Sequence, residues 1–212
     1  MESVASTLHR QLIRFGAEAF RARLIVSTCG NASLRLGSAM LVTGSGSQLG
    51  KLRSADLSLV DLAEGTRLEG PVPSSESLLH RLIYLVRTEV GAILHCQSEA
   101  ATCLACHPDP PEDLNFIPEV PVYVGRHAWV PYLEPGSPEL AEAVKDQLQD
   151  PEIGVVQLRN HGQVVVGRDP AEALRRALFF ERACGMALRG GLRTLTAPQV
   201  SSLQKRYGAG KA

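Results

Sequence analysis

The sequence predicts an α/β fold: one domain in which helices surround a sheet of mostly short strands. Segments with apolar residues at helical spacing alternate along the chain with short apolar runs rich in β-branched residues. The 212 residues contain no internal repeat and no linker, and this length suits one substantial domain. We therefore expect a single domain over residues 1–212, with a strand order that the pattern leaves open.

In the N-terminal half, the first helix is indicated by apolar residues such as Leu8, Leu12 and Phe15 at helical spacing. The short strands that follow are separated by turns rich in glycine and serine. Ser74 or Ser75 is expected to cap the next helix. These signals predict, in order, a helix over 4–23, strands over 30–36, 39–43 and 57–62, and a helix that starts after this cap and runs through the apolar period 78–86.

In the C-terminal half, two helices open on strong local signals. Ser137-Pro138-Glu139 combines a cap with a proline at the first helical position, and Asp169-Pro170-Ala171-Glu172 has the form of a capping box. The remaining elements follow from apolar runs and helical periods. The predicted order is a strand over 91–95, a helix over 99–106, a Pro-rich stretch over 108–121, a helix from 137, strands over 153–158 and 163–167, a helix over 169–188 and a last short helix from 196.

The composition excludes several classes of protein. Hydrophobic residues make up 44% of the chain and charged residues 21%, which argues against disorder. Twenty-two basic residues balance twenty-two acidic ones, so we expect neither a nucleic-acid partner nor an anionic membrane surface. No apolar run approaches the roughly 20 residues of a membrane span. The first residues lack a signal-peptide pattern, so we expect a cytoplasmic protein whose five cysteines are free thiols.

Two histidines are candidates for metal binding. On a strand that ends at His95, the side chains of His95 and Gln97 point to the same side and Cys96 points away. His161 lies in a polar turn between two buried runs, and the sheet could bring it to His95. Neutral imidazole suits zinc and related divalent ions, but each histidine alone also fits a hydrogen-bonded structural role.

Glu76 and His80 lie one turn apart on the same face of a predicted helix. Glu76 is expected in the first turn, where the helix dipole stabilises a carboxylate, and His80 is expected to support it or to pack in the core. A small anion could be held by backbone N–H groups and hydroxyl or amide donors, although such segments are usually simple turns. The candidate segments are Gly30-Asn31, Ser45-Gly46 and Ser74-Ser75.

Cys103-Leu104-Ala105-Cys106-His107 has the form of a c-type haem attachment site. Haem attachment normally requires export, for which we find no signal. The segment also fits a helix that packs alanine and leucine inward, and free cysteines are common in cores. We therefore interpret it as structural, and no second cysteine pair supports a zinc site.

Taken together, five motifs resemble the class II aldolase/adducin family in order and spacing, from the first helix almost to the end of the chain. Two further stretches, residues 45–50 and 130–136, are similar to the branch that decarboxylates 3-oxo-tetronate 4-phosphates. The five motifs are Gly30-Asn31-Ala32-Ser33, the loop from Thr43 to Gly46, Pro73-Ser74-Ser75-Glu76, the strand ending at His95, and Asn160-His161-Gly162.

The resemblance implies a three-layer fold with a central, mainly antiparallel sheet, and a homotetramer with active sites between subunits. It implies that His95 and His161 bind zinc, and that Glu76 is the acid/base and also touches the metal. Tyr207 would close the site from the tail, and Tyr123 lies near the position of a tyrosine supplied by a neighbouring subunit. The substrate-phosphate pocket would comprise Asn31, Ser45, Gly46, Ser74 and Ser75.

Gln97 departs from this family pattern, in which the strand usually carries His-x-His. An amide oxygen is a harder and weaker ligand than imidazole, so we expect a lower affinity for the one divalent metal of each subunit. Zinc is the first candidate, with manganese, iron and cobalt as alternatives. The site could also bind no metal at all.

The chemistry that the resemblance implies is cleavage of a carbon–carbon bond next to a carbonyl group. A divalent ion would stabilise the resulting enediolate, and Glu76 would move the proton. The predicted function is a metal-dependent lyase, either an aldolase or a decarboxylase, acting on a short phosphorylated sugar or sugar acid. The alternatives are a non-catalytic scaffold with a degenerate metal site, favoured by Gln97, and an epimerase or dehydratase of the same family.

Overall fold

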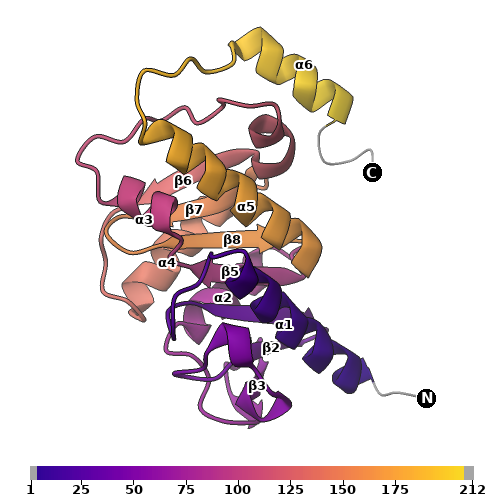
Figure 1. Ribbon diagram of the computed structural model, residues 1–212. Coiled ribbons are helices and arrows are strands. Elements are labelled where there is room, and N and C mark those ends of the chain that lie inside the picture. The colour runs from indigo at the N-terminus through magenta and orange to yellow at the C-terminus, as the bar shows by residue number, and fades with distance from the viewer. Residues whose placement is uncertain (1–3, 208–212) are drawn as a thin grey trace.

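An eight-stranded sheet forms the centre of the computed structural model, which describes residues 4–207 (Figure 1). The strand order is β4-β3-β2-β1-β5-β8-β7-β6. All neighbours are antiparallel except β6 and β7, which are parallel. This confirms the α/β class and the mainly antiparallel sheet. The strands are β1 (Asn31–Leu36), β2 (Ala39–Thr43), β3 (Leu57–Asp61), β4 (Arg67–Glu69), β5 (Ala92–Cys96), β6 (Arg126–Val130), β7 (Ile153–Leu158) and β8 (Gln163–Gly167).

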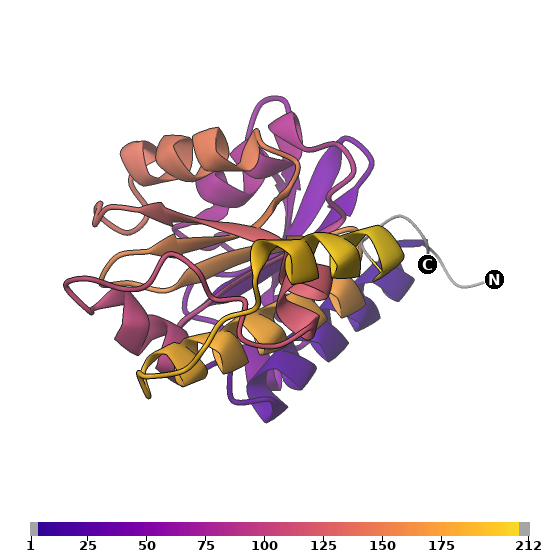
Figure 2. The ribbon, with the colours of Figure 1, turned by 90° about the horizontal axis from the view of Figure 1, so that it is seen from above.

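Helices cover both faces of the sheet, as the view from above in Figure 2 shows. One face carries α1 (Val4–Arg21), α3 (Glu99–Ala105) and α5 (Pro170–Ala187), and the other carries α2 (Ser77–Val86) and α4 (Pro138–Leu148). The last helix, α6 (Ala197–Tyr207), packs against η3 (Val120–Val124), a π-helical turn. The three-layer arrangement expected from the family resemblance is therefore present.

Each helix layer encloses its own hydrophobic core because strand side chains alternate between the two faces of the sheet. On β1, Ala32 and Leu34 enter the core beneath α1 and α5. Their neighbours Asn31 and Ser33 therefore face α2, and both are buried. The α2 side of the sheet thus receives buried polar groups at one end of β1.

Two predicted helix caps are confirmed. The Ser137 hydroxyl accepts a hydrogen bond from the backbone N–H of Leu140 at 3.1 Å, and the Asp169 carboxylate accepts one from Glu172 at 2.8 Å. Both signals lie within one turn of the helix that they start, so tertiary structure does not override them.

The predicted cap of α2 is wrong. Neither Ser74 nor Ser75 occupies the cap position; Glu76 does, and α2 begins at Ser77. The backbone N–H of Ser74 donates instead to the Thr43 carbonyl at 3.0 Å, which ties this segment to the end of β2. The Ser74 hydroxyl accepts from the Glu76 N–H at 3.3 Å, so Glu76 lies at the entrance of the helix and not in its first turn.

Other boundaries also differ from the prediction. Helix α1 ends at Arg21 because the chain turns at Arg23, whose φ of 61° is left-handed. The sequence did not reveal β4, η3 or β6. β4 is a short exposed strand at one edge of the sheet, and β6 joins the other edge by pairing in parallel with the distant β7. Neither strand has the alternating pattern that identifies a half-buried strand.

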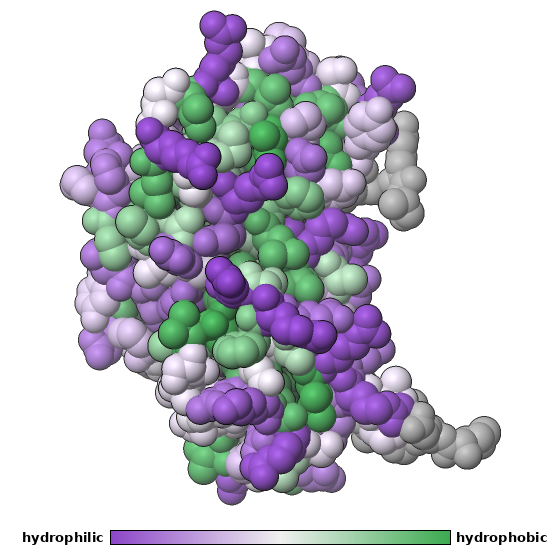
Figure 3. Space-filling view, in the orientation of Figure 1, coloured by the Kyte–Doolittle hydropathy of each residue, from purple (hydrophilic) through white to green (hydrophobic). Residues whose placement is uncertain are grey.

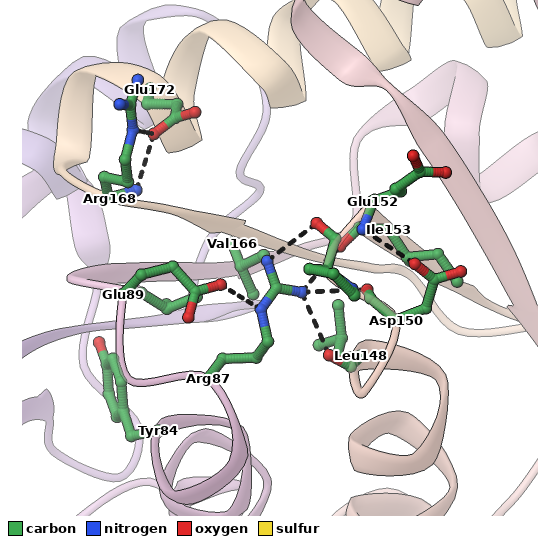
Figure 4. A network of polar contacts seen from close by, with 12 residues as sticks. Tyr84, Arg87, Glu89, Leu148, Asp150, Glu152, Ile153, Val166, Arg168 and Glu172 are labelled. Atoms are coloured by element: carbon green, nitrogen blue, oxygen red, sulfur yellow. Dashed lines mark hydrogen bonds and ion pairs between the residues drawn. The ribbon is translucent and has the colours of Figure 1, made fainter. Parts of the chain in front are cut away.

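A buried arginine connects the end of α2 to the start of β7 (Figure 4). Arg87 is 9% exposed, and its guanidinium donates to the backbone carbonyls of Leu148, Asp150 and Ile153 at 3.1–3.2 Å. It donates to the Pro151 carbonyl at 3.2 Å and also pairs with Glu89. The hydrogen-bond donors of this cation are therefore occupied by backbone oxygens and the Glu89 carboxylate.

All five cysteines are free thiols, as predicted. Cys103 and Cys106 are exposed, which corrects the expectation that they pack in the core; α3 buries Ala101, Leu104 and Ala105 instead. Within residues 4–207, we find no helix with the length and apolar character needed to span a membrane.

Candidate active site

Three strands and one helix bring the predicted metal ligands to one end of the sheet. β5 ends next to His95, and its two neighbours are antiparallel to it, so β1 and β8 both begin there. Asn31 is paired with His95 across β1 and β5, and His161 lies two residues before β8. Glu76, at the entrance of α2, approaches the same point.

The side chains of Glu76, His95 and His161 converge, with their nearest nitrogen and oxygen atoms less than 4 Å apart. His95 Nε2 lies 3.2 Å from Glu76 Oε2 and 3.3 Å from His161 Nε2, and His161 Nε2 lies 3.8 Å from Glu76 Oε1. Gln97 joins the group, with its amide nitrogen 3.2 Å from His95 Nε2. The structure therefore brings together all four side chains that the sequence nominated as metal ligands, a group we call the ligand cluster.

Two glycines allow this close approach. A Cβ atom on Gly30 would lie 2.7 Å from the His95 carbonyl oxygen, and Gly30 also has a left-handed φ of 91°. A Cβ on Gly162 would lie 2.4 Å from the Cys96 carbonyl oxygen and 2.9 Å from Gln97 Cγ. Any larger residue would push β1 or the turn that carries His161 away from the end of β5.

The hydrogen bonds around His95 define its chemistry. Its Nδ1 lies 3.1 Å from the Gln163 carbonyl oxygen, which can only accept, so Nδ1 carries a proton and Nε2 faces Glu76 and His161. Burial raises the pKa of Glu76. The charge and hydrogen bond of His95 lower this pKa by a larger amount in combination with the neighbouring groups, so the pKa of Glu76 lies below its ordinary value. Burial lowers the pKa of His95, but Glu76 outweighs burial and raises it. The pair therefore stabilises an ionised Glu76 and a positive charge beside it.

The donor set fits a divalent cation. Two oxygens of the cluster, Glu76 Oε1 and Gln97 Oε1, are buried without a hydrogen-bond partner within the described residues. His161 Nδ1 also lacks one, but His161 faces the cluster with Nε2. Turning the Gln97 amide by 180° would direct its oxygen at the cluster. Two ligand atoms bound at about 2.0–2.1 Å to one tetrahedral ion lie about 3.4 Å apart, close to the separations measured here. When His95 is neutral, its Nε2 lone pair and the Glu76 carboxylate face each other, and a cation between them would interact favourably with both.

A cavity of about 130 Å³ adjoins the cluster at Glu76. It is lined by all five residues that the sequence assigned to a phosphate pocket: Asn31, Ser45, Gly46, Ser74 and Ser75. The loops that carry these residues are held together by backbone hydrogen bonds, including Ser45 N–H to the Val72 carbonyl at 2.9 Å. Hydroxyl, amide and backbone donors therefore surround a space that opens beside the carboxylate.

The two predicted tyrosines lie elsewhere in the chain. Tyr123, in η3, is partly exposed and stacks on Phe179 with ring centroids 5.4 Å apart. Tyr207 is exposed at the end of α6, where the Arg206 guanidinium lies over its ring. Within residues 4–207, neither tyrosine lines the cavity or joins the cluster, so their predicted roles depend on a neighbouring subunit and stay predictions.

Sequence reasoning missed the polar residues that support Asn31 and Glu76 from behind. Ser33 and Tyr84 are fully buried and are hydrogen-bonded in a chain that reaches Glu76 through His80 and Asn31. The signal is visible in hindsight as polar residues at alternate positions of β1 and at every fourth position of α2. Asn31 was assigned to anion binding alone, whereas its amide also donates to Glu76 Oε2 at 2.9 Å.

Comparison with known proteins gives consistent matches. The protein-family model for the Class II Aldolase and Adducin N-terminal domain matches residues 10–188 of the sequence. The chain is 33% identical over 202 residues to 3-oxo-tetronate 4-phosphate decarboxylase of Haemophilus influenzae, covering 92% of this chain and 95% of the relative. It is 38% identical over 159 residues to L-fuculose phosphate aldolase of Methanococcus maripaludis, covering 75% and 84%. The crystal structure of YgbL from Klebsiella pneumoniae superimposes with a TM-score of 0.87 at 32% identity, covering 95% of this chain and 100% of that one.

Proposed function

Because the chain belongs to the class II aldolase and adducin family, we propose that it is a metal-dependent carbon–carbon lyase acting on a short phosphorylated sugar or sugar acid. The observation that carries the proposal is the ligand cluster with an anion cavity beside it. Relatives with a third of their residues in common are named as an aldolase of a sugar phosphate and a decarboxylase of a sugar-acid phosphate. Both reactions break a carbon–carbon bond next to a carbonyl group.

The metal would be held by His95, His161, Gln97 and Glu76. A divalent cation bound there would supply Lewis-acid stabilisation of the negative charge left on the substrate oxygens when the bond breaks. Zinc is the first candidate because imidazole ligands suit it; the amide of Gln97 makes manganese, iron and cobalt alternatives.

The chain's own residues bind the substrate and move the proton. Donors around the cavity would hold the phosphate, so that binding energy far from the reacting carbons fixes their position. The Glu76 carboxylate is ionised and lies at the boundary of cavity and cluster, where it can take up or return a proton. Within the described residues, no lysine is buried, which supports this route over a Schiff-base mechanism.

The site would be completed by a second subunit in a homotetramer. Tyr207 and Tyr123 are exposed and away from the cluster of their own chain, so a neighbouring copy would receive them. Apolar residues such as Phe20, Val26 and Leu178 are left exposed, and Figure 3 shows hydrophobic residues between hydrophilic ones on the face that carries α1 and α5. A cytoplasmic location also stays a prediction.

Elemental analysis of protein purified without chelator tests the metal. We expect about one divalent ion per chain in the wild type, strongly reduced content in His161→Ala, and unchanged content in His107→Ala, which alters an exposed histidine outside the cluster. Turnover measured on a panel of sugar phosphates and sugar-acid phosphates should follow the metal content.

The outcome also separates the alternatives. A wild-type protein with neither metal nor turnover would contradict the proposal and favour a non-catalytic scaffold, the reading that Gln97 supports. Release of carbon dioxide identifies a decarboxylase, and release of an aldehyde identifies an aldolase. Isomerised or dehydrated products without bond cleavage would instead identify an epimerase or a dehydratase.

A further inference from the structure

A row of buried polar side chains runs behind Glu76 between β1 and α2. Asn31 and Ser33 lie two residues apart on one face of β1. Glu76, the residue before α2, is followed at intervals of four by His80 and Tyr84 on one face of the helix. All five side chains are at most 8% exposed. The side chains from the strand and those from the helix thus alternate along the row, and each side chain contacts the next one.

The contacts form one continuous chain of hydrogen bonds. Tyr84 Oη lies 2.9 Å from Ser33 Oγ, which lies 2.6 Å from His80 Nδ1. On the other side of the ring, His80 Nε2 lies 2.6 Å from Asn31 Oδ1. Asn31 Nδ2 then donates to Glu76 Oε2 at 2.9 Å.

The Glu76 carboxylate, at one end of the chain, determines the donor and the acceptor in each of these hydrogen bonds. An ionised carboxylate can only accept, so Asn31 must present its NH₂ group to Glu76 and its oxygen to His80. That oxygen can only accept, so the proton of His80 is on Nε2 and its Nδ1 carries a lone pair. Ser33 therefore donates to Nδ1 and accepts from the Tyr84 hydroxyl. Burial lowers the pKa of His80 to about 3, in keeping with a neutral ring.

The Asn31 amide has a second N–H group, and Asn31 also lines the anion cavity. One N–H donates to Glu76, and the other is available to an anion in the cavity. If the amide turned by 180°, its oxygen would face the carboxylate and the cavity would lose this donor. The Glu76 carboxylate opposes that rotation from one side, and a donor at His80 Nε2 opposes it from the other.

We propose that His80 is a positioning residue that fixes the orientation of the Asn31 amide, so that one NH₂ group serves both Glu76 and the substrate phosphate. Phosphate binding and the placement of the carboxylate are thereby coupled through Asn31. This inference rests on the proposed function, since it takes the cavity as the phosphate subsite and Glu76 as the proton-transferring group.

Two measurements on the full-length protein test the proposal. Nitrogen-15 NMR of labelled histidine, assigned with the His80→Gln variant, reports which ring nitrogen of His80 carries the proton, and we expect Nε2. Calorimetric titration with inorganic phosphate compares the wild type, His80→Leu and His80→Gln. We expect His80→Leu to bind phosphate about tenfold more weakly, the loss of roughly one hydrogen bond. His80→Gln, whose amide nitrogen can replace Nε2 as donor, should recover most of the affinity.

The result also separates this inference from the proposed function. A His80 ring protonated on Nδ1, or undiminished phosphate binding by His80→Leu, would overturn the coupling while leaving the proposed function intact. Failure of the wild type to bind phosphate would overturn both. The NMR measurement does not use His80→Leu, so a misfolded His80→Leu protein would not protect the proposal.

Discussion

Arg87 and the ligand cluster are both buried and charged, but they differ in how fully their hydrogen-bonding groups are satisfied. Arg87 donates to four backbone carbonyls and a carboxylate, so its charge is surrounded by oxygen acceptors (Figure 4). The ligand cluster instead leaves three buried polar atoms without partners among the described residues. Burial and charge are similar in both places, whereas hydrogen-bond satisfaction is not.

The difference teaches where to look for function. A saturated network such as that of Arg87 stabilises the fold and has no capacity to bind anything else. An unsatisfied buried set is costly in the free protein, and a ligand that completes it recovers that cost. Under the proposed function, the bound ion would recover that cost at the ligand cluster.

The largest effect should come from Glu76→Gln. Glutamine keeps the size of the side chain and an oxygen that can accept from Asn31, but it cannot transfer the proton. We expect kcat to fall by about 10²–10⁴-fold while the free energy of unfolding changes by less than about 1 kcal/mol. Steady-state kinetics and urea unfolding measure the two quantities. Full activity of the variant would remove Glu76 from the mechanism.

Arg87→Met should give the reverse pattern. Methionine fills similar space but leaves the carbonyls of residues 148, 150, 151 and 153 without their donor. Because an unsatisfied buried acceptor costs about 1–3 kcal/mol, we expect an overall loss of about 3 kcal/mol in unfolding free energy. Metal content and kcat per folded molecule should be close to wild type at low temperature. Unchanged urea stability would contradict the structural role assigned to Arg87.

Gln97→His should complete the cluster with a third imidazole. Imidazole is a better ligand than a neutral amide for zinc, so we expect zinc affinity to rise by about tenfold or more. Competition with a chromogenic chelator measures this change. Gln149→His, on the surface at the end of α4, serves as the control and should leave the affinity unchanged. Equal affinities for wild type and Gln97→His would place residue 97 outside the metal site.

Glu172→Gln should have the smallest effect and one that depends on pH. Burial raises the pKa of Glu172. Hydrogen bonds from Arg168 and the charge of Arg176 together outweigh burial, so the pKa of Glu172 lies below its ordinary value. Ionised Glu172 therefore stabilises the fold above its ordinary pKa, and this contribution disappears as the pH falls through the lower pKa of the folded state. We expect the variant to be less stable by about 1 kcal/mol at pH 7. Unfolding curves for the two proteins should converge as the pH is lowered, and a constant difference would contradict this account.

Elements with local signals could be predicted from the sequence, and those that depend on distant partners could not. The caps at Ser137 and Asp169 were predicted because the capping residue and the first turn are adjacent in the chain. The cap of α2 was not, since the Ser74 backbone pairs with Thr43, some thirty residues away. β6 was missed for a similar reason: its strand structure depends on pairing with β7.

The same division holds for the candidate site. His95, His161 and Glu76 could be nominated because their residue types and motifs are distinctive. Their convergence is a property of the antiparallel register around β5, which no single segment encodes. Ser33 and Tyr84 were overlooked because serine and tyrosine have no special signature until the strand and the helix are placed face to face.

The ligand cluster draws its atoms from positions 76, 95, 97 and 161, on segments that meet only when the central strands are paired. By mass action, any ion that binds the assembled cluster and not the open chain raises global stability, in proportion to the logarithm of its free concentration. The bound ion would act as a reversible cross-link between the two halves of the polypeptide, and chelation would loosen the sheet along β5 and β8 first.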